Sequence, residues 1–203
     1  MSTVHIEEPP VEAVLQPLGF DQARGKQAMR LFVASEAFLF LMLFFSYFFL
    51  SNGDWRWLNQ EPPKLTLSII MLVVLLASSA VLRWGERRVE EGSFARGRAA
   101  MGVTVLMGLA FLGLSALDYK DHLQHLTPQM NAYGSVFYTI TSFHVAHLIL
   151  GLLMLGYVLI LPRVGQTDRP PHRAYSDAAL YWHFVDIVWV FIVGLLYILP
   201  NIR

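Results

Sequence analysis

The stretch from Leu65 to Leu82 reads LTLSIIMLVVLLASSAVL and contains no Lys, Arg, Asp or Glu. A second run, AAMGVTVLMGLAFLGLSAL from Ala99 to Leu117, is equally free of formal charge. A helix that crosses a bilayer needs roughly 20 mostly apolar residues, and both runs reach about that length. The two stretches therefore predict membrane-spanning helices, and they determine how the rest of the chain is interpreted.

Five segments meet the same test, at about residues 27–50, 65–84, 99–118, 134–161 and 178–199. They lack the short alternating pattern of membrane strands, so a closed barrel is excluded and an all-α bundle remains. The connections are short and rich in proline and glycine, which leaves no room for a separate soluble domain. We therefore expect a cytoplasmic N-terminal tail over residues 1–26 and a five-helix transmembrane domain over residues 27–203.

The composition narrows the possible functions. Of the 203 residues 55% are hydrophobic, and 15 basic residues balance 15 acidic ones, so no net charge favours nucleic acid as a partner. The chain has no cysteine, which excludes disulfides, zinc thiolate sites, iron–sulfur clusters and c-type haem attachment on it. Any metal chemistry would have to use histidine and carboxylate side chains.

The basic residues are distributed unevenly between the two ends of the predicted bundle. Eleven of the 15 fall at one end, namely Arg24, Lys26, Arg30, Arg83, Arg87, Arg88, Arg96, Arg98, Arg163, Arg169 and Arg173. Cytoplasmic connections carry the excess of Lys and Arg in membrane proteins. The N-terminus is therefore predicted to be cytoplasmic and the C-terminus outside.

Five polar side chains lie inside the predicted spans: Glu36, His144, His147, His183 and Asp186. At about 1.5 Å per residue, Glu36 lies roughly 14 Å and Asp186 roughly 12 Å from the cytoplasmic starts of their spans. His147 lies roughly 20 Å from the cytoplasmic end of its span. Depth alone therefore predicts one polar layer where the first, fourth and fifth helices meet.

Three interpretations of these side chains remain open. They can be interhelical hydrogen-bonding groups, which are common in membrane bundles. They can form a proton route or an acid–base site, because a carboxyl group in apolar surroundings can carry a proton. They can also bind a metal or haem, but His147 and His183 differ in predicted depth by roughly 10 Å, which disfavours haem ligation.

A further polar cluster follows the third span and includes Asp118, His122 and His125. We expect a solvated helix end rather than a metal site there.

Four blocks of sequence resemble one known family. They are Ser35-Glu36 with the aromatic run to Phe49, Gly108 to Gly113 followed by Asp118-Tyr119, Tyr133-Gly134-Ser135 with Phe143 to Gly151, and Tyr181 to Trp189. In order and spacing these blocks are similar to subunit III of haem-copper respiratory oxidases, the cytochrome c oxidase subunit 3 family, in its five-helix bacterial form. Asp118 stands where the family usually has Glu.

The resemblance implies a non-redox subunit of an oxidase that reduces O2 to water and pumps protons. It implies packing on subunit I, with subunit II and a subunit IV as further partners, in a bacterial inner membrane. Haem and copper would belong to the partners, and cytochrome c or quinol would act on the complex. The chain itself would bind phospholipids and would carry no catalytic, metal-binding or cofactor-binding residue. Glu36, His144, His147, His183 and Asp186 are the positions expected to support structure, lipid binding or a proton path.

Two alternatives remain at this level. The chain could serve a quinol oxidase or a nitric oxide reductase, since the electron donor and acceptor bind other subunits. It could also be a proton-coupled transporter that uses Glu36 and Asp186, although it lacks the internal repeats common in transporters.

Overall fold

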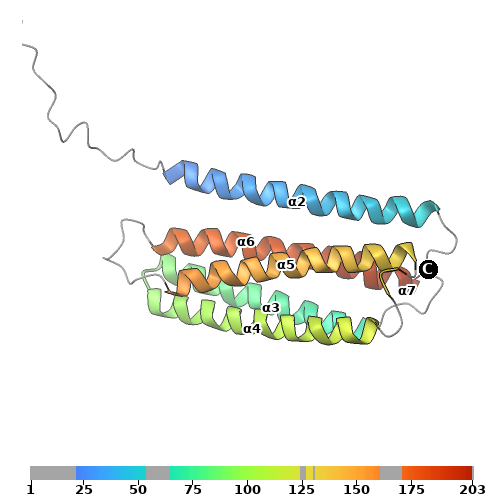
Figure 1. Cartoon of the computed structure of the whole chain (residues 1–203). Helices are drawn as coiled ribbons and strands as arrows, with labels where there is room; N and C mark the ends of the chain where they lie inside the picture. The colour runs from blue at the N-terminus through green and yellow to red at the C-terminus, as the bar shows by residue number, and fades with distance from the viewer. Residues whose placement is uncertain (1–21, 54–64, 124–126, 130, 161–170, 203) are drawn as a thin grey trace, which may run out of the picture.

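The computed structural model describes residues 22–53, 65–123, 127–129, 131–160 and 171–202. Five long helices run side by side and alternate in direction (Figure 1): α2 (Gln22–Gly53), α3 (Leu65–Glu90), α4 (Phe94–His122), α5 (Ala132–Ile160) and α6 (Pro171–Ile192). The last continues through a π-helix, η1 (Val193–Ile198), into α7 (Leu199–Ile202). All five are long and apolar enough to cross a membrane, and the described residues contain no strand. The predicted all-α class with five such helices is confirmed.

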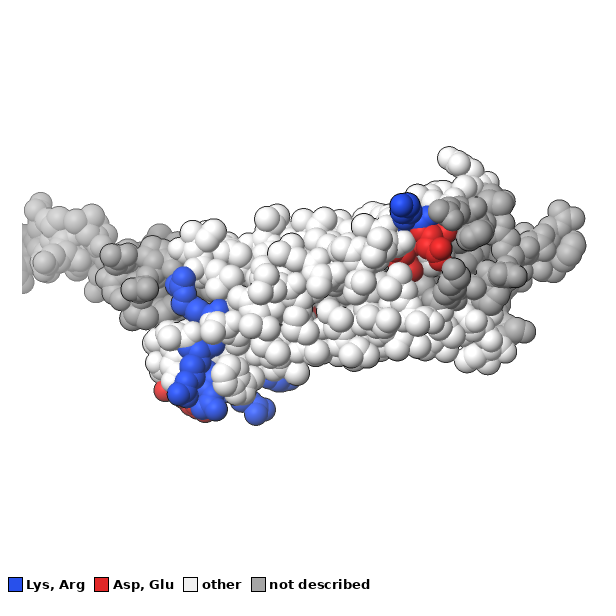
Figure 2. Space-filling view, turned by 90° about the horizontal axis from the view of Figure 1, so that it is seen from below, with Lys and Arg blue, Asp and Glu red and all other residues white. Residues whose placement is uncertain are grey.

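The helices do not coincide with the predicted apolar spans. Four of them extend past the predicted limits, and α6 begins at Pro171 rather than near residue 178. A helix can continue into the polar interface, where charged side chains are tolerated. Figure 2 shows an uncharged middle on the face it displays, with Lys and Arg gathered mainly at the end where α3 stops and α4 begins. The predicted tail lies mostly in residues 1–21, outside the described residues, and the orientation in the membrane stays a prediction.

The helices α3 and α4 form a tight antiparallel hairpin. Its turn contains Gly92 with φ of 83°, a left-handed conformation that favours glycine. A Cβ at Gly85 would collide with Tyr175 and Ala100, and a Cβ at Gly97 would collide with Val89. Because lipid supplies little hydrophobic drive between helices, such close backbone approach is a main source of packing energy in membranes.

Trp182 of α6 occupies the centre of the bundle. Its indole is fully buried, and it fills the space left by Gly108 of α4 and Gly151 of α5. Its Nε1 donates a hydrogen bond of 2.9 Å to Ser78 Oγ of α3. One side chain therefore joins four helices.

The end of the last span contains a proline and is also joined to α5 by a side-chain hydrogen bond. Pro200 has no backbone N–H, so it cannot bond the carbonyl of Leu196 four residues earlier. The Tyr133 hydroxyl donates to that carbonyl at 2.6 Å. This bond ties the first turn of α5 to the end of η1.

The helix α2 lies at the edge of the bundle (Figure 1) and packs against α5 and α6. In the most apolar 18-residue stretch of α2 only 11% of the residues are buried, against 50% in the corresponding stretch of the last span. Its exposed side chains include Phe38, Phe45 and Phe49. Most of α2 therefore faces whatever surrounds the chain in the membrane.

Candidate functional site

The structure joins Glu36 of α2 to His147 of α5. His147 Nε2 lies 2.8 Å from Glu36 Oε2, and both side chains are largely removed from the surface. On its other side, His147 Nδ1 lies 2.6 Å from the backbone oxygen of Phe143. The ring of Phe40 lies against the imidazole at 4.9 Å between centroids. The pair is thus held in one place by two helices and an aromatic neighbour.

The hydrogen bonds of His147 constrain where protons sit. A backbone carbonyl only accepts, so Nδ1 donates to Phe143. The Nε2 atom then either donates to an ionised Glu36 or accepts from a protonated Glu36. In both arrangements the pair is neutral overall and holds one mobile proton between two helices. A neutral pair is far less costly at membrane depth than an isolated charge.

This pairing gives a prediction for a double-mutant cycle. Glu36→Ala and His147→Ala should each destabilise the chain, and the double variant should lose about 0.5–2 kcal/mol less than the sum of the two. The measurement is reversible unfolding in mixed micelles, followed by circular dichroism. Phe38→Ala combined with His147→Ala is the control, because Phe38 is exposed on α2, and its effect should be additive. Additivity of the Glu36 and His147 changes would contradict the pairing.

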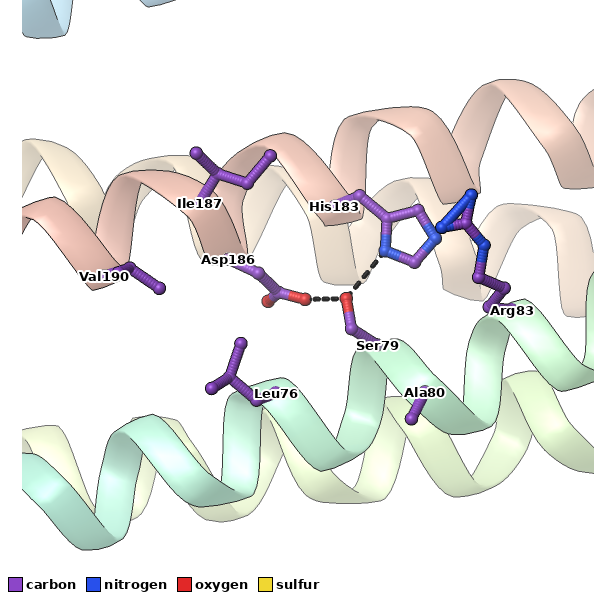
Figure 3. Close-up of a pocket in the computed structure, with 8 residues that line it drawn as sticks. All are labelled: Leu76, Ser79, Ala80, Arg83, His183, Asp186, Ile187 and Val190. Atoms are coloured by element: carbon purple, nitrogen blue, oxygen red, sulfur yellow. Dashed lines mark hydrogen bonds between the residues drawn. The ribbon is translucent and has the colours of Figure 1, made fainter.

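Asp186 and His183 of α6 meet Ser79 of α3, as Figure 3 shows. The Ser79 hydroxyl donates to Asp186 Oδ2 in a short hydrogen bond. Because that hydroxyl has one hydrogen, His183 Nδ1, at 2.6 Å from Ser79 Oγ, must be the donor of the second bond. Asp186 Oδ1 and His183 Nε2 have no hydrogen-bond partner among the described residues.

The role of Asp186 as a packing group can be tested by substitution. Asp186→Ala removes the acceptor for Ser79, and we expect a loss of about 1–2 kcal/mol in chain stability or in subunit association. Asp186→Asn should be milder, because the amide oxygen can still accept. Thermal unfolding in detergent and recovery of the complex after purification would report the two effects. Equal and negligible changes for both variants would count against a packing role.

His144 lies one turn from His147 on α5 but has different surroundings. It is fully buried, stacks on Trp189 at 4.9 Å between centroids, and meets the edge of Phe111. Neither ring nitrogen has a hydrogen-bond partner in the described part of the chain. In this arrangement His144 packs as an aromatic ring.

Asp118 lies near the end of α4 that is farther from the turn between α3 and α4. We call that turn the Arg-rich turn, because Arg87, Arg88, Arg96 and Arg98 flank it. The expectation of a solvated helix end is wrong for Asp118 and His122, which are both buried, while Lys120 is exposed. Tyr197 of η1 donates to Asp118 Oδ2 at 2.8 Å, and His122 Nδ1 donates to the Asp118 backbone oxygen at 2.9 Å. His125 lies outside the described residues. Asp118 thus connects α4 to the last span.

The predicted polar residues form two groups, not one layer. Glu36 and His147 meet between α2 and α5, whereas Asp186 and His183 face α3. The predicted depth difference of roughly 10 Å between His147 and His183 was counted from the predicted spans, and the observed helices begin and end elsewhere. Counted from Ile160 and Pro171, the two lie about 20 and 18 Å along their helices. Among the described residues, no three His, Asp or Glu side chains converge closely enough to hold a metal ion.

The sequence interpretation missed three residues that complete these contacts: Ser78, Ser79 and Tyr197. A signal for the serines was available, because Ser78 and Ser79 are adjacent polar residues inside an otherwise aliphatic span. Serine in a span commonly bonds its own helix backbone, as Ser78 does with the Leu75 carbonyl, so its presence alone does not indicate a partner.

Comparisons with known proteins agree with the four sequence blocks. A family model described as cytochrome c oxidase subunit III matches residues 22–200. Cytochrome c oxidase subunit 3 of Gallus gallus is 32% identical over 180 residues, which cover 85% of this chain and 68% of the relative. The protein of the same name from Bacillus subtilis is 32% identical over 176 residues, which cover 83% of each chain. The one from Triticum aestivum is 32% identical over 181 residues, which cover 82% of this chain and 65% of the relative.

Proposed function

The chain belongs to the cytochrome c oxidase subunit III family, and on that premise we propose that it is the non-redox subunit III of a bacterial terminal oxidase. The complex reduces O2 to water and pumps protons across the inner membrane. The observation that carries this proposal is the family match over residues 22–200, which includes all five long helices. Membership makes the chain a multi-pass subunit of an oxidoreductase complex.

The side chains of this subunit support a role without redox chemistry. The chain has no cysteine, and His144, His147 and His183 pack against or hydrogen-bond to other side chains of the bundle. Haem and copper accordingly belong to the partner subunits in this proposal. Subunit I is the main partner, with subunit II and a subunit IV also in the complex.

Phospholipids are the second class of partner in the proposal. The helix α2 exposes a row of aromatic and aliphatic side chains over most of its length, including Phe38, Leu41 and Phe45. Lipid acyl chains match such a surface. The Arg-rich turn between α3 and α4 supports a cytoplasmic position for that end, where anionic headgroups add attraction.

The Glu36 and His147 pair supports a contribution to proton uptake. The pair holds one proton in either of two arrangements, so that proton can shift between the Glu36 carboxylate and His147 Nε2 without changing the net charge of the pair. In this proposal the pair of Glu36 and His147 prolongs the time over which the complex sustains turnover. The reduction of O2 takes place in the partner subunits that carry haem and copper.

Purification through a tag on this chain tests the assignment. In mild detergent the chain should bring down subunits with haem absorbance and copper, and the complex should consume O2 with reduced cytochrome c. A complex depleted of the chain should start at a similar rate and lose activity sooner during turnover. Consumption of O2 with quinol alone would instead assign a quinol oxidase. A stable homo-oligomer without haem-bearing partners, or proton flux in liposomes that contain only this chain, would overturn the proposal.

A further inference from the structure

The Glu36 carboxyl group lies between two layers of aromatic rings. On one side the ring of Phe40 meets that of Phe184 at 6.2 Å between centroids. On the other side Phe32 stacks on Tyr181 at 5.9 Å, with an angle of 19° between the ring planes. Phe32 and Phe40 each lie one helical turn from Glu36 on α2, so both layers adjoin its side chain. Tyr181 is the only one of the four rings that carries a polar group.

The ring of Tyr181 also contacts α5, one turn from His147. Its Cδ1 atom lies 3.5 Å from the position of a Cβ at Gly151, which follows His147 by four residues. Phe32 precedes Glu36 by four residues on α2, which runs antiparallel to α5 (Figure 1). Both contacts therefore place the Tyr181 ring on the same side of the Glu36 and His147 pair, one turn toward the start of α2.

Tyr181 and Glu36 each have hydrogen-bonding capacity that the described chain leaves unused. The Tyr181 hydroxyl is buried and has no partner among the described residues, and the Glu36 carboxylate interacts with it electrostatically. Oε2 of Glu36 bonds His147, whereas Oε1 accepts no hydrogen bond within the described residues. A phenol can donate and a carboxylate oxygen can accept, so each group supplies what the other lacks. Buried polar groups without a partner are rare in native proteins.

Of these two side chains, Glu36 is the one that can adjust. The Tyr181 side chain is fully buried and is held by the stack on Phe32 and the contact with Gly151. The Glu36 side chain is flexible and 22% exposed, so its carboxylate can turn without displacing the core. A small rotation would bring Oε1 toward the Tyr181 hydroxyl while Oε2 stays beside His147.

We propose that Tyr181 is a positioning residue for the Glu36 and His147 pair: its hydroxyl donates to Glu36 Oε1 when Glu36 is ionised. A hydrogen bond to an ionised group is roughly twice as strong as one between neutral groups. The bond from Tyr181 therefore favours the arrangement in which the shared proton lies on His147 Nε2. In the other arrangement that proton lies on Glu36 Oε2, and Tyr181 loses its charged acceptor.

This inference rests on the proposed function, in which the pair contributes to proton uptake. It adds to that function the residue that decides which member of the pair holds the proton. The hydroxyl of Tyr181 acts only through Glu36, so a test has to report the protonation of that carboxyl group and not only stability.

Infrared spectroscopy of the purified full-length chain in lipid tests the role of Tyr181. The C=O stretching band of protonated Glu36 is identified by its absence from Glu36→Gln. At neutral pH, Tyr181→Phe should raise the ratio of protonated to ionised Glu36 about tenfold, which corresponds to about 1.4 kcal/mol. Phenylalanine keeps the stacked ring and removes only the donor. Tyr175→Phe is the matched control, because it removes a buried hydroxyl of the same helix that bonds the Leu82 carbonyl, and it should leave the band unchanged.

The outcomes separate this inference from the proposed function. A stronger band in Tyr181→Phe alone supports the inference, whereas an unchanged band, or equal increases in Tyr181→Phe and Tyr175→Phe, overturns it. As a second measurement that keeps every native tyrosine, Glu36→Gln should shift the C–O vibration of one isotope-labelled tyrosine, and an unchanged tyrosine spectrum also overturns it. These spectra need no oxidase partner. A tagged chain that recovers no haem-bearing subunit would defeat the proposed function and leave the hydrogen bond to be judged by the spectra.

Discussion

Trp182→Ala is expected to lower the free energy of unfolding by about 3 kcal/mol or more, the range for removing a fully buried large aromatic. The indole occupies space against α4 and α5 and bonds Ser78 of α3, so its loss leaves a cavity where four helices meet. Lipid is too bulky to enter such a cavity, and the packing contacts are lost outright.

Denaturant or thermal unfolding in mixed micelles, followed by circular dichroism, would measure the effect of Trp182→Ala. Trp182→Phe should be milder, since it keeps most of the ring volume and loses the bond to Ser78. Trp84→Ala is the matched control, because Trp84 is 47% exposed on α3, and its loss should cost about 1 kcal/mol or less. Similar losses at Trp182 and Trp84 would contradict the central role of Trp182.

Gly108→Leu is expected to destabilise the chain by about 3 kcal/mol, at the upper end of the range for overpacking. Even a Cβ at this position would lie 2.6 Å from Trp182 and 2.7 Å from Leu152. The indole of Trp182 cannot move aside, because Gly151 of α5 lies against its other edge. The bundle would therefore have to separate α4 from α6.

Gly113→Leu on the same helix is the matched control for Gly108→Leu. No atom lies within 4 Å of the position of its Cβ, so leucine there meets open space. Replacing glycine within a helix by a good helix former favours the helix by up to about 1 kcal/mol. The two substitutions should thus shift the unfolding midpoint in opposite directions, and shifts of the same sign would contradict the packing argument.

The number of helices and the fold class were predictable because they depend on the length and composition of apolar runs along the sequence. The uncharged runs at Leu65 to Leu82 and Ala99 to Leu117 can only be satisfied as helices in a bilayer. Depth counting also placed Glu36 and His147 in one predicted polar layer, at roughly 14 and 20 Å from the cytoplasmic side, and the structure places them in contact. Position along a helix follows from residue number at a constant rise.

Rotation about the helix axis and packing against neighbours do not follow from residue number. Asp186 lies at the depth predicted to meet Glu36, but its side of α6 faces Ser79 of α3. Asp118 was expected in solvent because charged residues follow it, yet Tyr197, which is 79 residues away, covers it. Each of these contacts depends on which faces of two helices meet, and only the packed bundle determines that choice.

The edge position of α2 has a consequence for the order of synthesis. This helix leaves the ribosome before α5 and α6, the helices against which it packs. Glu36 lies 111 residues before His147, so at about 5–20 residues per second it waits roughly 5–20 s for its partner. During that time α2 has to remain in lipid alone with an unpaired carboxyl group. The long apolar run from Phe38 to Leu50 makes this possible, because it anchors the helix without help from the bundle.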